Sequence, residues 1–318
     1  MRGRVKIDWL IVGILTAVAI AIVAPARGGV AEFFSTAANV AIAALFFLHG
    51  ARLSTREALA GLTNWRLHSV ILAFTYVVFP IIGVALRFAV GTFIPSDLAM
   101  GFLYMALVPS TVQSSVAFTA VARGNVPGAI VAASTSNLVG VVATPLLVML
   151  TMQVGTGVRI DTSVFIDISL QLLLPFIIGQ LLRPWVGRFA SAKATSFVDK
   201  FSISLVVYVA FSQGMVERVW ASTSIAALLI LCVLAAVILV FMLWLTRLTA
   251  TRLHFNRADQ IAIQFCGTKK SIATGLPMAA VIFGGSTAML ILPLMLYHQI
   301  QLIVCAWLAA RYAKQNAG

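Results

Sequence analysis

Residues 257–283 read RADQIAIQFCGTKKSIATGLPMAAVIF, an apolar stretch with two adjacent lysines, Lys269 and Lys270, near its middle. As a helix, a stretch of this length crosses the ~30 Å hydrocarbon core of a bilayer. One lysine at the centre of such a helix costs about 2.5–3.5 kcal/mol on insertion scales, so intramembrane lysines are functional candidates. The structural alternatives are snorkelling of the side chains to the membrane surface and a wrongly placed span. Both alternatives require the lysines to reach water.

The composition of the whole chain indicates the same environment. Of its 318 residues 61% are hydrophobic and 10% charged, whereas soluble domains carry about 25% charged residues. This composition excludes a water-soluble enzyme. The sequence also lacks a P-loop, a Gly-x-Ser-x-Gly elbow and a His-Glu-x-x-His motif, and its three cysteines have no metal-type spacing. We therefore expect no enzymatic activity, no metal site and no cofactor, and leave sodium open.

Reading the chain with about 20 residues per span predicts an all-α polytopic membrane protein. Ten transmembrane helices are expected at residues 8–25, 34–50, 67–91, 98–122, 126–152, 163–183, 200–216, 224–248, 257–283 and 287–311. The first of these precedes Ala24-Pro25-Ala26 and also resembles a signal peptide with its cleavage site. We interpret it as a span, because only then is the number of spans even.

The distribution of the basic residues predicts the orientation. The net charge is +13, and most lysines and arginines fall in every second connection, in clusters such as Arg2, Arg4 and Lys6. Cytoplasmic loops carry this excess, so both termini are expected in the cytoplasm, as in a multi-pass protein of the cell inner (plasma) membrane. Short clusters between apolar runs do not form the continuous basic patch of a nucleic-acid-binding protein.

Ten spans divide into two sets of five, here residues 1–155 and 156–318. Because five is odd, the second set must insert upside down relative to the first, and inverted repeats of this kind characterise secondary transporters. The two halves are expected to form one integrated membrane domain.

A polar interruption in each half marks the candidate site. Residues 107–116 read LVPSTVQSSV, where a proline precedes a polar run, and they correspond to the lysine-bearing stretch of the second half. Backbone groups freed at such breaks need partners in the protein or line a water-filled cavity. The candidate substrate- or ion-binding residues at the breaks are Thr111, Gln113, Ser114, Ser115, Gln264, Thr268, Lys269, Lys270 and Ser271.

Two further spans contribute candidates. Ser134, Asn137 and Thr144 recur on one helical face of 126–152 and are expected to face span 98–122, either in a site or as interhelical hydrogen bonds. His298 is a proton-relay candidate or a partner of a backbone carbonyl. All nine acidic residues lie at or near predicted span ends, so no mid-span carboxylate is expected to neutralise the lysines. The cavity is therefore expected to be electropositive or to hold an unprotonated lysine.

Residues 46–80, 109–145 and 258–309 resemble the bile acid:sodium symporter family, in particular its YfeH-type branch, which includes the seventh member of solute carrier family 10. The motif that carries this resemblance is Ala258-Asp259 … Phe265-Cys266-Gly267-Thr268-Lys269-Lys270-Ser271 … Gly275-Leu276-Pro277. The resemblance implies ten spans in two inverted five-helix repeats, a panel domain and a core domain. It also implies that broken helices four and nine cross in the core and that transport proceeds by alternating access.

The resemblance also implies sodium ligands, and this sequence departs from them. Ser114-Ser115 replaces a Ser-Asn pair, Ala129 and Ala133 fall where the family has sodium ligands, and Gln264 replaces a glutamate. The sodium chemistry of the family therefore does not carry over residue by residue, and neither does a preference for bile acids.

The leading hypothesis is a secondary active transporter of a small organic anion, in which the mid-membrane lysines replace part of the sodium site. Ammonium groups and the N-termini of half-helices attract anions. Lys270 is favoured over Lys269 as the anion-binding side chain. One alternative is a sodium-coupled organic anion symporter with ligands relocated to Ser134, Asn137 and backbone carbonyls. Another is a non-transporting membrane regulatory protein.

Overall fold

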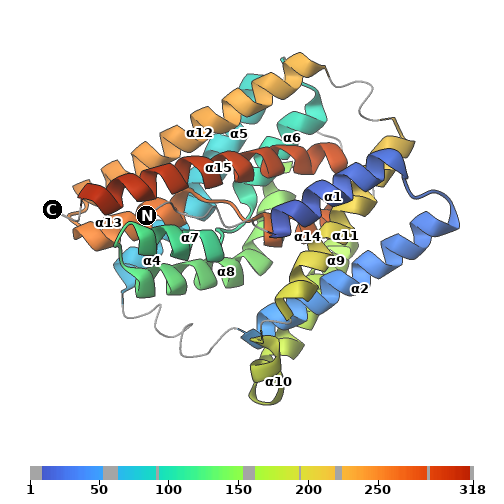
Figure 1. Cartoon of the computed structure of the whole chain (residues 1–318), viewed down its shortest axis with the longest axis horizontal. Coiled ribbons are helices and arrows are strands. Elements are labelled where there is room, and N and C mark those ends of the chain that lie inside the picture. The colour runs from blue at the N-terminus through green and yellow to red at the C-terminus, as the bar shows by residue number, and fades with distance from the viewer. Residues whose placement is uncertain are drawn as a thin grey trace. The chain divides into compact units, whose positions relative to one another are not determined.

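The computed structural model describes residues 9–52, 64–90, 93–152, 162–192, 195–218, 224–284 and 287–315. Within these ranges every regular element is a helix and no strand occurs (Figure 1). The basic cluster Arg2, Arg4 and Lys6 and the predicted boundary between the repeats at residue 155 lie outside the described residues.

The helices follow one another along the chain with short connections. They are α1 (Trp9–Val23), α2 (Gly29–Arg52), α4 (Trp65–Ala73), the π-helical turn η1 (Phe74–Val78), α5 (Phe79–Val90), α6 (Ser96–Leu107), α7 (Gln113–Val121), α8 (Val126–Met152), α9 (Thr162–Leu181), α10 (Arg183–Ala190), α11 (Thr195–Val216), α12 (Ile225–Arg252), α13 (Arg257–Thr268), α14 (Ile272–Phe283) and α15 (Ala288–Gln315).

Six of the described helical segments are long and apolar enough to cross a membrane, or seven if the bent pair 170–181 and 183–190 counts as one span. The six are Gly29–Arg52, Trp65–Ala89, Val126–Met152, Thr195–Val216, Ile225–Arg252 and Ala288–Gln315. The predictions 34–50 and 200–216 are too short, because α2 and α11 continue past the apolar stretch and include charged residues such as Glu32 and Asp199.

The chain divides into two compact units, and the first comprises Met1–Arg52, Leu170–Ser222 and Leu276–Ala288. Here α1 and α2 each pack on α11, and α10 packs on α2. Helices α2 and α9 approach through reciprocal glycines. A Cβ added at Gly50 would collide with the carbonyl of Phe176, and one at Gly179 with the carbonyl of Phe47. Glycine is therefore needed at both positions for this backbone contact, as is common between membrane helices.

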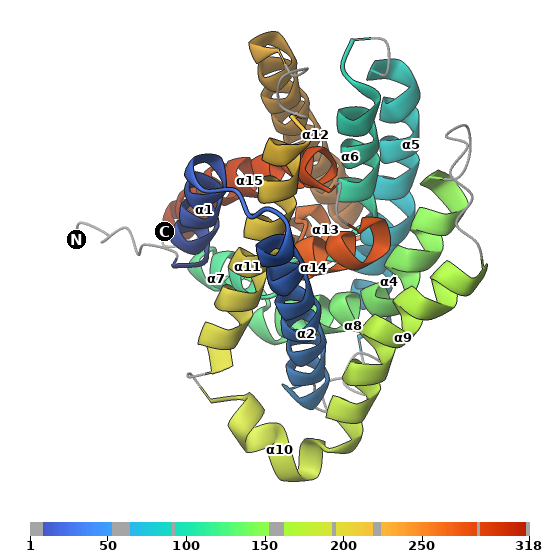
Figure 2. The same ribbon diagram turned by 90° about the vertical axis from the view of Figure 1, so that its right-hand side faces the viewer.

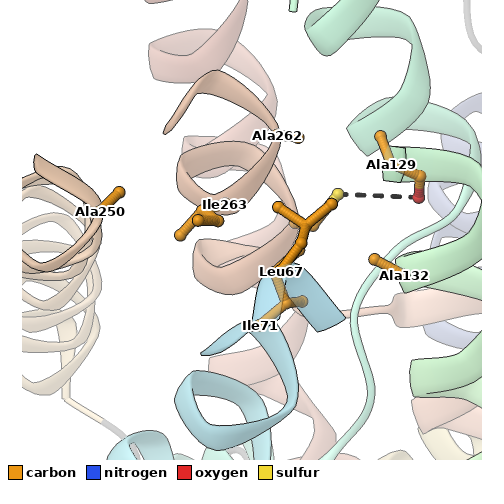
Figure 3. Packing of buried hydrophobic residues seen from close by; sticks show 8 residues of the cluster. Leu67, Ile71, Ala129, Ala132, Ala250, Ala262 and Ile263 are labelled. Atoms are coloured by element: carbon orange, nitrogen blue, oxygen red, sulfur yellow. Dashed lines mark hydrogen bonds between the residues drawn. The ribbon is translucent and has the colours of Figure 1, made fainter. Parts of the chain in front are cut away.

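The second unit comprises Leu53–Ser169, Thr223–Gly275 and Met289–Gly318. Figure 2 shows α5 and α6 of this unit side by side, and α13 packs against α7, α8 and α12. An apolar cluster joins α4, α8, α12 and α13 (Figure 3). It contains the buried residues Leu67, Ile71, Ala129, Ala132, Ala250, Ala262, Ile263 and Cys266. This packing holds α13, and with it the lysine-bearing segment at its end.

Two helix ends inside this unit have clear local causes. Helix α6 stops at Leu107 because Val108 precedes Pro109 and is extended, with φ −77° and ψ 156°. Helix α13 begins at its cap Asn256, whose side chain accepts from the Asp259 amide at 2.9 Å, and it ends before Lys269, which is extended at φ −87° and ψ 152°. Residues 108–112 and 269–271 thus form two non-helical segments, each between two helices of a largely apolar stretch.

Candidate functional site

The ammonium of Lys270 forms hydrogen bonds with backbone carbonyls at the end of α6. Its Nζ donates to the carbonyl oxygens of Ala106 at 2.7 Å, Val108 at 2.9 Å and Thr75 at 3.1 Å. It also lies 4.2 Å from the centre of the Phe79 ring, and the side chain is fully buried. The last carbonyls of a helix have no partner within the helix and carry partial negative charge. All three ammonium N–H donors of Lys270 are thereby used by backbone oxygens.

The third acceptor, the carbonyl of Thr75, is available because of a proline. In the π-helical turn η1 the Phe79 amide donates to the carbonyl of Phe74, five residues earlier. The next bond of this pattern would run from residue 80 to Thr75, but Pro80 has no N–H. The Thr75 carbonyl is therefore left without its helical donor, and Lys270 supplies one.

The neighbouring carbonyls of residues 107–110 also have partners from other elements. Thr144 Oγ1 of α8 donates to Leu107 at 2.9 Å, and the Ser271 amide donates to Pro109 at 2.8 Å. Asn137 Nδ2 donates to the Ser110 carbonyl at 2.8 Å. Asn137 and Thr144 of the polar face predicted on residues 126–152 thus contact the end of α6 and the segment after it. Its hydrogen bonds satisfy backbone groups that have no access to bulk water.

The last turn of α13 and the segment after it are held in the same way. Ser110 Oγ donates to the Cys266 carbonyl at 2.6 Å, and Tyr297 Oη donates to the Thr268 carbonyl at 2.8 Å. The Gln301 side chain pairs with the backbone of Lys270, accepting from its amide and donating to its carbonyl, both at 2.9 Å. Residues 269–271 thus donate to the segment after α6, Ser110 of that segment donates to the last turn of α13, and α8 and α15 supply further donors and acceptors.

Lys269 is equally buried but lacks such partners. Its Nζ has no hydrogen-bond partner among the described residues. It lies 3.8 Å from the centre of the Phe118 ring and 5.6 Å from that of Phe265. A cation over an aromatic face gains about 0.5–2 kcal/mol, which is less than the several kcal/mol needed to bury an ammonium. The three N–H donors of Lys269 are thus available to an acceptor.

No carboxylate pairs with either lysine within the described ranges. The ion pair found there joins Arg52 to Asp199 in the first unit. Asp259 lies ten residues before Lys269, about 15 Å away along α13, and accepts from Asn125 at 2.6 Å and Asn256 at 2.8 Å. The described part of the chain also contains no cluster of three or more His, Cys, Asp or Glu side chains suited to a metal ion.

The candidates just before α7 and in its first turn form a small hydroxyl cluster. Thr111 Oγ1 lies 2.9 Å from Ser114 Oγ and 3.0 Å from Ser115 Oγ, and Ser115 donates to the Phe265 carbonyl at 3.4 Å. Gln113 is exposed at the first residue of α7. The structure thus joins Ser115 to α13 and Thr111 to Ser115, but leaves Gln113 at the surface.

The other candidates bond mainly to neighbouring helices. Gln264 donates to the Leu243 carbonyl at 2.8 Å and accepts from Tyr312 at 2.9 Å, and Thr268 Oγ1 lies 3.3 Å from Thr246 Oγ1. Ser271 Oγ caps α14 by accepting from the Thr274 amide at 3.2 Å.

His298 and Ser134 complete the set. His298 Nδ1 lies 2.8 Å from Gln301 Nε2 and 3.3 Å from the Lys270 carbonyl. Ser134 is partly exposed.

Several residues of this network are absent from the predicted set. They are Thr75, Ser110, Ser136, Thr274, Tyr297 and Gln301. Two signals in the sequence point to some of them: Gln301 lies one helical turn after His298, and Pro80 follows Thr75 by five residues. Many of the acceptors are backbone carbonyls, and the order of side chains in the sequence does not show which carbonyls will accept these bonds.

The positions to which the resemblance assigns sodium ligands are apolar and packed. Ala129 and Ala133 are both fully buried, and Ala129 belongs to the cluster of Figure 3. The dashed line there joins the Ala129 carbonyl to the Cys266 sulfur, 3.8 Å away. Methyl side chains offer no oxygen to a cation, so these two side chains are not sodium ligands.

Comparison with known proteins agrees with this architecture. Residues 8–314 match the SBF-like CPA transporter family. An uncharacterized protein of Pseudomonas aeruginosa is 46% identical over 99% of this chain and 96% of its own length. YfeH of Escherichia coli (strain K12), named as a candidate symporter, is 44% identical over 98% of this chain and 94% of its own. Sodium/bile acid cotransporter 7 of Rattus norvegicus is 30% identical over 95% of this chain and 91% of its own. With its apolar helices and a match over nearly the whole chain, this multi-pass membrane protein belongs to the SBF-like CPA transporter family.

Proposed function

We propose that the protein is a secondary active transporter that moves a small organic anion across the membrane by alternating access. In this proposal Lys269 binds the anion, and Lys270 replaces a bound cation between two broken helices. The observation that carries the proposal is the contrast between the two neighbouring ammonium groups. Lys270 has three carbonyl partners, whereas Lys269 has no hydrogen-bond partner in the described residues.

The role of Lys270 follows from its acceptors. In transporters with discontinuous helices, unwound backbone carbonyls and the C-terminal ends of half-helices bind the coupling cation. Lys270 presents a positive charge to oxygens of this kind at the end of α6. We therefore assign it a structural role, which reverses the preference for Lys270 as the anion ligand drawn from the sequence.

The proposed role of Lys269 follows from the absence of a hydrogen-bond acceptor for its ammonium among the described residues. A buried ammonium without an acceptor favours binding of an anion, because the anion supplies both the opposite charge and the missing hydrogen bonds. Ser114 and Ser115 stand four and three residues before Phe118, whose ring contacts Nζ, and are proposed to add hydroxyl donors. The alanines at positions 129 and 133 support a site that does not depend on sodium there.

The proposed topology has ten spans in two inverted repeats, residues 1–155 and 156–318. The six long apolar segments and the bent pair would be joined by α1, by α6 with α7, and by α13 with α14. Each half then contains a helix interrupted at a polar segment, followed by a long helix that bonds to the interruption. The two compact units support a panel and a core domain, and the distribution of basic residues supports cytoplasmic termini in the inner membrane.

The test begins with a thermal-shift screen of carboxylates, sulfonates and phosphate esters at fixed salt and pH, followed by uptake of the stabilising anion into proteoliposomes. Lys269→Met is expected to abolish uptake and anion-induced stabilisation, because it removes the ammonium. Its melting temperature without ligand should not fall, since an unpaired buried charge is lost.

The matched control is Lys314→Met, which removes an exposed lysine from the last turn of α15. It is expected to transport at the parental rate. Parental uptake by Lys269→Met would refute the proposed anion site. If neither the parent nor any variant transports any stabilising anion, a regulatory role replaces the transport proposal.

A further inference from the structure

A polar pocket lies in the first unit, where α10 meets the end of α2. Its volume is about 420 Å³, and three arginines, Arg52, Arg183 and Arg188, line it together with Gly187 and Ser191. The site is separate from the lysines of the second unit and does not depend on the proposed transport function. Three guanidinium groups around one pocket favour an anionic occupant.

Helix α10 has three different faces. Val186 and Ala190 pack against α2 and belong to an apolar cluster with Leu48 and Ala51. Trp185 and Phe189 lie one turn apart and are 77% and 67% exposed. Arg183 and Arg188 line the pocket on the remaining face. A short helix with exposed aromatic residues beside a basic face is the pattern of helices that lie in the membrane interface.

The bend before α10 is compatible with that position. The chain turns by 102° between 170–181 and 183–190, and α10 then packs on α2 (Figure 2). A helix at about a right angle to a spanning segment runs roughly parallel to the membrane surface. The aromatic side chains of α10 would then contact acyl chains, and its arginines would face headgroups.

The charges of the pocket are only partly neutralised. Arg52 donates from Nε to the Ala190 carbonyl at 2.7 Å and from a terminal nitrogen to Asp199 at 2.6 Å. Neither Arg183 nor Arg188 forms an ion pair with an acidic residue of the described ranges. A guanidinium has five N–H donors and matches phosphate geometry with two parallel bonds, so this pocket offers more donors than its own acceptors use.

We propose that this pocket binds the phosphate of an anionic phospholipid headgroup, with Trp185 and Phe189 in contact with the acyl chains. A phospholipid provides both the anion for the arginines and the apolar surface for the exposed aromatic residues, whereas free phosphate provides only the first. Basic pockets on the cytoplasmic side of membrane proteins bind lipid headgroups in this way, and the predicted orientation places residues 183 and 188 on that side.

The experiment measures thermal unfolding of the full chain in neutral detergent with added phosphatidylglycerol, phosphatidylcholine or inorganic phosphate. Phosphatidylglycerol is expected to raise the melting temperature, and the zwitterionic lipid and inorganic phosphate much less. The double variant R183Q/R188Q should bind phosphatidylglycerol about 30-fold more weakly, because two basic contacts are lost. R188Q alone, at an exposed position, should show a smaller loss in the same direction.

The matched control is R27Q/R218Q, which removes two exposed arginines of the same unit outside the pocket. It should respond to phosphatidylglycerol as the parent does. Equal stabilisation by both lipids would overturn the proposal, as would an equal loss in R27Q/R218Q. A full shift with inorganic phosphate and none with phosphatidylglycerol would assign the pocket to soluble phosphate and overturn the lipid assignment.

Discussion

Two adjacent lysines have different surroundings because the backbone at Lys269 is extended. Side chains of consecutive residues in an extended segment point to opposite sides. Lys270 therefore reaches the carbonyls at the end of α6, while Lys269 lies over the Phe118 ring of α7. The sequence predicts both lysines at a helix break in mid-membrane, and in the structure both side chains are fully buried within the protein. It does not predict which lysine is satisfied, because the deciding acceptors are backbone oxygens of distant segments.

Lys270→Met is expected to lower the free energy of unfolding by about 3 kcal/mol or more, because three buried carbonyls lose their donor and each such loss costs ~1–3 kcal/mol. Thermal unfolding in detergent measures the effect. Lys269→Met, one residue away and equally buried, is the control and is expected to show no loss. Equal melting temperatures for Lys270→Met and the parent would contradict the structural role of this ammonium.

At the scale of helices, the end of α6 is stabilised by hydrogen bonds from other segments of the chain. The carbonyls of its last turn and of residues 109–110 bond to side chains of α8 and to residues 270–271. The stop at Leu107 follows from Pro109 and the polar run after it, so this end could be predicted from the sequence. The π-helical turn η1 could not, because Pro80 alone is equally compatible with a simple kink. Its consequence, a free carbonyl at Thr75, becomes evident only from Lys270, 195 residues away in the chain.

Thr144→Val is expected to destabilise the protein by ~1–3 kcal/mol, since the valine leaves the buried carbonyl of Leu107 without its donor. Thr151→Val on the same helix is the matched control. Its hydroxyl donates to the Leu147 carbonyl one turn earlier in α8 and joins no second helix. Unfolding in urea compares the two variants, and a loss of similar size in both would show that the contact between α8 and α6 adds nothing.

At the scale of the whole molecule, the lengths of the apolar stretches predict most helix bounds well. Helix α8 coincides with the predicted 126–152, and α13 and α14 together coincide with 257–283. The division into two compact units is harder to predict, because each unit combines distant stretches of chain. Adjacent residues such as Ser169 and Leu170 fall in different units, and no local pattern marks that boundary.

Uptake into proteoliposomes is expected to proceed without a sodium gradient. The side chains at 129 and 133 are methyl groups, and Lys270 supplies the positive charge at the end of α6. Imposing sodium and proton gradients separately, with choline replacing sodium as the control cation, measures the requirement. A strict need for sodium would refute the replacement of a sodium ion by lysine and would favour relocated ligands.

The covalent attachment of Lys270 has a consequence for energetics. A free ion can dissociate into the medium at each turnover, and that release is how an electrochemical gradient performs work on a carrier. The charge of Lys270 is tethered to the main chain by its own side chain, so it remains with the protein throughout the cycle. In the proposed transport cycle the side chain of Lys270 is therefore not exchanged with the medium, and any ion that drives transport must bind at another position.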